Sequence, residues 1–72
     1  MFIILTRPSG TKIRINVNTI VKYFTIKVVE SGGKNRDDAR IHLMDTSYVD
    51  VIETLDEVDQ LISRYTSIYK NI

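Results

Sequence analysis

Residues 51–62 read Val-Ile-Glu-Thr-Leu-Asp-Glu-Val-Asp-Gln-Leu-Ile, and this stretch decides the fold because a strand pattern passes into a helix within a few residues. Thr54 can cap the helix, and Glu57 three residues later can accept a hydrogen bond from the amide of Thr54, which is the pattern of a capping box. Carboxylates at Asp56 and Glu57 also suit the positive end of the helix dipole. The stretch therefore predicts a helix over residues 55–70.

One face of this helix is expected to be buried. Apolar residues recur at intervals of three and four for more than four turns, at Leu55, Val58, Leu61, Ile62, Tyr65, Ile68, Tyr69 and Ile72. A stripe of this kind needs a cover, and we expect a β-sheet built from the preceding residues to provide it.

Upstream of the helix, the sequence predicts five short strands. Alternating and β-branched residues place them at roughly 2–7, 12–17, 20–29, 39–44 and 48–53. Turn-forming residues follow the first strand at Pro8, Ser9 and Gly10. Residues 30–38 contain no apolar side chain and predict a mobile loop. The expected fold class is α+β, with one domain over residues 1–72. It consists of an antiparallel sheet of four or five strands, which can be curled, and the C-terminal helix packed on one face of this sheet.

The length and composition limit how such a domain is stabilised. A chain of 72 residues can bury only a small core. It contains no Cys, which excludes disulfides and thiolate metal sites, so packing or self-association must stabilise it, and a homodimer is the simplest assembly. The apolar start Met-Phe-Ile-Ile-Leu is too short to span a bilayer and has no secretion-signal pattern around it. We expect a cytoplasmic protein without membrane insertion.

The charges are distributed unevenly along the chain. Up to Met44, eight Lys and Arg residues stand against three Asp and Glu residues, a net charge of +5; from Asp45 onward, two stand against six, a net charge of −4. This asymmetry can mark a basic face for a polyanion, or it can draw the strands and the acidic helix start together within one domain. The second interpretation is favoured because a nucleic-acid-binding domain usually carries a larger net charge than the +1 of this chain.

Catalytic chemistry finds little support in the sequence. The chain has a single His, His42, which makes both a His-based metal cluster and a Ser/His/Asp triad unconvincing. In a strand it would lie opposite Ile41 and Leu43, at the surface or partly packed. An acidic cluster matches no calcium-loop spacing, and helix capping accounts for several of its members: Asp45, Asp50, Glu53, Asp56, Glu57 and Asp59. We therefore predict no catalytic residues, no metal site and no cofactor.

The start of the chain resembles a known family. The string Leu5-Thr-Arg-Pro-Ser-Gly, followed by Asn16 and then Ile20, is similar to the opening of the small flagellar FlbD family, also called the SwrD swarming-motility proteins.

The start of the predicted helix resembles the same family. The string Val51-x-Glu-Thr-x-Asp-Glu-Val, followed by Ile62, is similar to its closing Val-x-Glu-Ser-x-Glu-Glu-Val segment. The two blocks cover about half of the chain, and the middle departs through a longer loop around Gly32. The resemblance implies a small cytoplasmic, non-enzymatic protein that supports flagellar motor function by contacting other proteins. It brings no catalytic residues.

Two functional classes remain open from the sequence. The first is a non-enzymatic protein-interaction or assembly module that uses a sheet edge or a spare apolar face. Because aromatic residues dominate interface hot spots, its candidate contact residues are Phe2, Tyr23, Tyr48 and Tyr69.

The alternative is a small nucleic-acid-binding protein that uses a basic sheet face. Its candidate phosphate contacts are Arg14, Lys27, Lys34, Arg36 and Arg40. Strand alternation works against it, since Lys27 would share a face with Tyr23 while Lys22 would point with Phe24. This scatters the basic patch.

Overall fold

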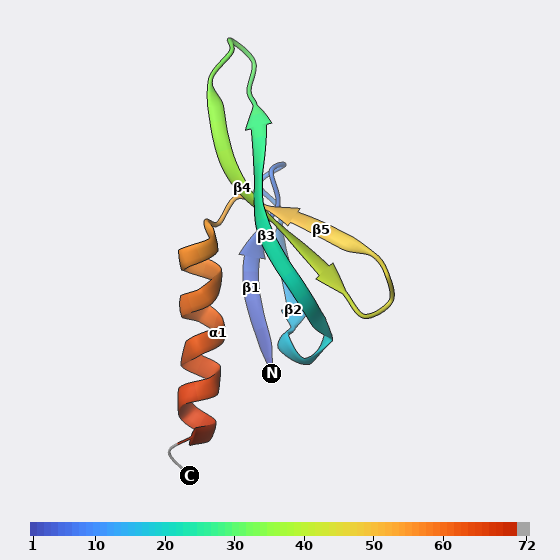
Figure 1. Ribbon diagram of the computed structural model, residues 1–72, viewed down its shortest axis with the longest axis vertical. Helices are drawn as coiled ribbons and strands as arrows, with labels where there is room; N and C mark the ends of the chain where they lie inside the picture. Colours follow the sequence, from blue (N-terminus) through green and yellow to red (C-terminus); the bar gives the residue numbers. More distant parts are fainter. Residues whose placement is uncertain (71–72) are drawn as a thin grey trace.

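Five strands are followed by one long helix in the computed structural model, which describes the backbone of residues 1–70 and the side chains of residues 1–64. Figure 1 shows the helix lying alongside the strands. The elements are β1 (Phe2–Thr6), β2 (Lys12–Asn16), a 3-10 turn (Val17–Thr19), β3 (Ile20–Val29), β4 (Asn35–Leu43), β5 (Tyr48–Val51) and α1 (Leu55–Lys70). The α+β class and the C-terminal helix that starts at Leu55 are confirmed.

The strands form two antiparallel sheets. β1 and β2 make a hairpin, and β4 lies between β3 and β5 in a three-stranded sheet. The two sheets meet at Thr6. The amide of Ile52 donates to the carbonyl oxygen of Thr6 at 2.8 Å, and the amide of Thr6 donates to Oε1 of Glu53 at 2.8 Å. These bonds fix the end of β1 beside the segment that follows β5. β5 ends at Val51, two residues before the predicted end.

The mobile loop predicted over residues 30–38 is wrong for residues 35–38, which belong to a strand. β4 begins at Asn35 rather than at Ala39, and its pairing with β3 continues to Val29. Only a short turn remains, closed by a 2.7 Å hydrogen bond from the amide of Glu30 to the carbonyl oxygen of Lys34. Low apolar content did not prevent strand formation here, because backbone pairing and ion pairs between the polar side chains stabilise the extended hairpin.

The core lies between the two sheets and the first half of α1. Its buried apolar residues are Ile3, Leu5, Ile15, Ala39, Ile41, Val51 and Val58. Leu55, Leu61 and Ile62 of α1 pack against this cluster, which confirms the first half of the predicted apolar stripe. The side chains of the second half, Tyr65, Ile68, Tyr69 and Ile72, lie outside the described residues.

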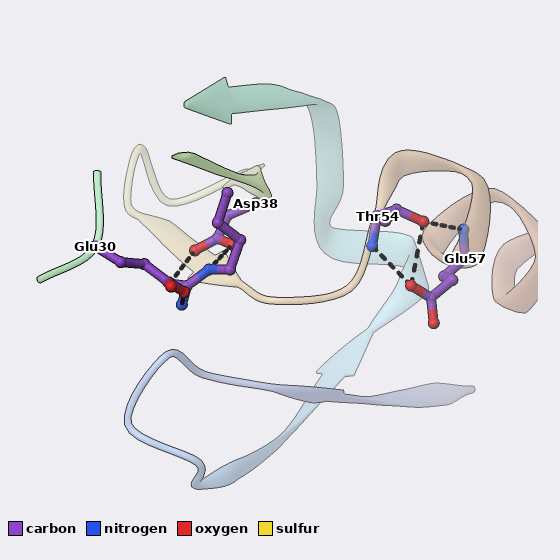
Figure 2. Close-up of polar contacts among 5 residues, drawn as sticks. Glu30, Asp38, Thr54 and Glu57 are labelled. Atoms are coloured by element: carbon purple, nitrogen blue, oxygen red, sulfur yellow. Dashed lines mark hydrogen bonds and ion pairs between the residues drawn. The ribbon is translucent and has the colours of Figure 1, made fainter. Parts of the chain in front are cut away.

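The predicted capping box is present at the start of α1. The amide of Glu57 donates to Oγ1 of Thr54 at 3.2 Å, and the amide of Thr54 donates to Oε1 of Glu57 at 3.1 Å. Figure 2 shows the two side chains reaching back toward each other's backbone. The box satisfies amides that would otherwise lack a partner in the first turn, so it fixes where the helix begins.

Candidate protein-interaction surface

The three-stranded sheet has an outer face, on the side opposite the buried Ile41 and Val51. Because side chains alternate along a strand, every second residue of β3, β4 and β5 points to this face. The strand register sets these residues in rows across the sheet: Lys22, His42 and Tyr48 form one row, and Phe24, Arg40 and Asp50 form the next.

Four side chains of these rows form one continuous cluster, which we call the aromatic strip: Phe24, His42, Tyr48 and Arg40. The rings of Phe24 and His42 are stacked, with centroids 5.5 Å apart and an interplanar angle of 27°. The rings of His42 and Tyr48 are also 5.5 Å apart, at 33°. Phe24 keeps 38% of its surface exposed and Tyr48 keeps 54%, so the strip is ordered by its own contacts and still open to solvent.

Arg40 ties this strip to the edge of the sheet. Its Nε donates to Oδ1 of Asp50 at 2.8 Å and its Nη2 donates to Oδ2 at 3.1 Å, a two-point pair across neighbouring strands. The same guanidinium lies over the ring of Tyr48, with Cζ 4.3 Å from the ring centroid. The hydrogen bonds to Asp50 raise the pKa of Arg40 above its ordinary value, so the group stays charged.

The predicted interface residues lie at different places. Phe2 is 61% exposed on β1, and Tyr48 belongs to the aromatic strip. Tyr23 packs against the core and donates its hydroxyl hydrogen to the carboxylate of Asp59, a bond that raises the pKa of Tyr23 to about 12. The side chain of Tyr69 lies outside the described residues.

Three of the five predicted phosphate contacts already have carboxylate partners. Lys27 lies 3.8 Å from Asp37 in an exposed pair. Arg36 and Arg40 are engaged by acidic neighbours. The other two, Arg14 and Lys34, are exposed on β2 and in the turn between β3 and β4. The structure therefore gives no single basic face made of these five residues within residues 1–64.

A buried carboxylate stabilises the long hairpin near its turn. Asp38 is only 1% exposed, and Arg36 binds it through Nε at 2.7 Å and Nη2 at 3.1 Å. The remaining Nη1 of Arg36 donates to Oε1 of Glu30 at 2.5 Å. Figure 2 shows the side chains of Glu30 and Asp38, which both bind the guanidinium group of Arg36. The arrangement satisfies a buried charge, so we assign it a structural role.

The pairing of the arginines with carboxylates was not predicted from the sequence. Arg36 and Asp38 are two residues apart in a strand, a spacing that places both side chains on one face and could have revealed their contact. Arg40 and Asp50 lie ten positions apart, and only the strand register brings them together.

Comparison with known proteins gives no significant match to a family model, a curated protein or a solved structure. Within the described part of the chain, no group of three or more His, Cys, Asp or Glu side chains is arranged to hold a metal ion. No helix in that part has the length and apolar content needed to cross a membrane.

Proposed function

We propose that this chain is a non-enzymatic protein-interaction module whose contact surface is the aromatic strip on the outer face of β3, β4 and β5. The resemblance to the FlbD family gives the proposal a setting: a cytoplasmic accessory to the flagellar motor that acts by contacting other proteins.

The observation that supports this proposal is the cluster of Phe24, His42, Tyr48 and Arg40, in which Phe24 and Tyr48 are exposed and His42 and Arg40 are half-buried. Aromatic and Arg side chains contribute most of the binding energy at protein interfaces. Here their mutual stacking and the pair between Arg40 and Asp50 already restrict the rotamers. Binding to such a surface costs less conformational entropy than binding to freely rotating side chains.

Nucleic-acid binding is the second candidate, since stacked aromatic rings on a sheet can also receive bases. Ion pairing weighs against it. Affinity for a nucleic acid depends on cations that displace counterions from phosphates, and Lys27, Arg36 and Arg40 are paired with carboxylates.

Light scattering coupled to size exclusion tests the simplest form of the proposal, a homodimer. We expect the measured mass of the wild-type chain to rise from monomer toward dimer as concentration increases, and Tyr48→Ala to suppress this rise. Ser63→Ala, at an exposed polar position on α1, is the matched control and should behave as the wild type. A chain that stays monomeric and binds single-stranded DNA in a salt-sensitive manner would support the second candidate instead.

A further inference from the structure

The outer edge of β5 carries unpaired backbone groups. In the antiparallel pair of β4 and β5, the amide of Leu43 donates to the carbonyl oxygen of Ser47, so the odd-numbered residues of β5 bond to β4. The N–H and C=O groups of Tyr48 and Asp50 therefore point the other way. No hydrogen bond among the residues that the structure describes uses them. An edge of this kind is a template for a further strand.

A groove runs beside this edge. Its volume is about 530 Å³, and its apolar lining comes from Ile13, Leu43 and Val49, which are half-buried. The turn after β1 also lines the groove, with Arg7 and Pro8. Figure 1 shows the start of β5 lying away from β1 and its end pointing toward the end of β1. β5 is an edge strand of its sheet, so its outer side has no neighbouring strand there.

The charges around the groove favour an acidic occupant. Asp50, its only lining carboxylate, is neutralised by Arg40. Arg7 is exposed, and among the described residues no carboxylate lies within ion-pair distance of it. The groove thus brings together a free cation, an apolar lining and a row of unpaired backbone donors and acceptors. This combination complements an extended peptide with an apolar residue flanked by carboxylates.

We propose that an extended segment of a partner protein binds this groove as an added strand on β5, with an apolar side chain against Ile13, Leu43 and Val49 and a carboxylate beside Arg7. This inference rests on the proposed role as a protein-interaction module and names a second contact surface with its partner chemistry. The added strand pairs with the backbone of Tyr48 and Asp50, whereas the aromatic strip is on the outer face of the same sheet.

The probe is the peptide acetyl-Glu-Thr-Val-Thr-Glu-amide, added to the isotope-labelled chain and followed by its amide NMR spectrum. A Glu two residues to either side of the Val brings a carboxylate toward Arg7 in either strand direction. We expect saturable shifts at the amides of Tyr48 and Asp50. Replacing both Glu residues by Lys should weaken binding about tenfold through loss of charge complementarity. N-methylation of the Val and both Thr residues should abolish binding, because the peptide can then no longer pair as a strand.

Two variants of the chain separate the groove from the aromatic strip. Arg7→Glu should reverse the preference, so that the Lys peptide binds more tightly than the Glu peptide. Phe24→Ala should leave peptide affinity unchanged, even though it damages the surface used in the proposed function. Absence of shifts at Tyr48 and Asp50 with every peptide, or equal binding of the N-methylated peptide, would each overturn the proposal.

Discussion

Tyr23 donates its hydroxyl hydrogen to the carboxylate of Asp59, and this bond joins the middle of β3 to the first half of α1. Deprotonation of the phenol would place two negative charges at the contact. The hydrogen bond to Asp59 is the main reason why the pKa of Tyr23 is raised from 10.0 to about 12. The contact ties the helix to the sheet only while the phenol keeps its proton.

Alkaline conditions should therefore loosen the domain through Tyr23. The folded-state pKa lies above that of the unfolded chain, so the stabilising effect is complete below pH 10 and is lost as the pH rises toward 12. Denaturant unfolding at several pH values checks this. Tyr23→Phe, which keeps the ring but cannot donate, should lose less stability than the wild type between pH 10 and 12. Identical pH profiles for the two chains would show that the bond does not couple the helix to the sheet.

The capping box should contribute measurably to the stability of α1. Thr54→Ala removes the acceptor for the amide of Glu57 and should lower the free energy of unfolding by about 1 kcal/mol. Thr54→Ser, which keeps the hydroxyl, is the control and should stay close to the wild type. Chemical denaturation followed by circular dichroism measures the difference. Equal losses for both variants would contradict a capping role for the hydroxyl.

Burial predicts losses of stability of different size at two neighbouring residues of β1. Leu5 is fully buried and Ile4 is 50% exposed. Leu5→Ala should cost about 3 kcal/mol, because it removes buried methyl groups and leaves a cavity in a small core. Ile4→Ala should cost well under half of that. Comparable losses measured by urea unfolding would mean that the two faces of β1 are equally buried.

The buried Asp38 makes Arg36 far more important than a surface cation. Arg36→Ala would leave an unpaired carboxylate inside the hairpin and should destabilise the domain by about 3 kcal/mol. Lys27→Ala breaks the exposed pair with Asp37 and should change stability by less than about 1 kcal/mol. Thermal unfolding of the two variants compares them directly. A small loss for Arg36→Ala would indicate that water reaches Asp38.

The sequence predicted the elements whose signal is local. The helix start at Leu55 follows from Thr54 and Glu57, which lie within one turn of each other. β3 follows from a run of β-branched and aromatic residues. These features need no information from distant parts of the chain.

The features that were missed depend on contacts between distant residues. The first part of β4 has no apolar pattern, and its strand conformation depends on pairing with β3. The way in which the two sheets meet depends on the bonds that Thr6 makes with Ile52 and Glu53, about 47 positions away. The aromatic strip likewise exists only because the register brings Phe24, His42 and Tyr48 into line. Strand register is set by the whole fold, so composition and periodicity could not reveal it.

A photo-crosslinking amino acid at position 48, compared with the same group at position 63, tests the central claim most directly. The aromatic strip is proposed as a protein contact surface, so position 48 should give one defined protein adduct in cells of the source organism, and position 63 on α1 should not. Phe24→Ala in the same chain should remove that adduct while the chain stays folded. Adducts at position 48 that nuclease treatment destroys, or protein adducts that persist with Phe24→Ala, would contradict the proposed function.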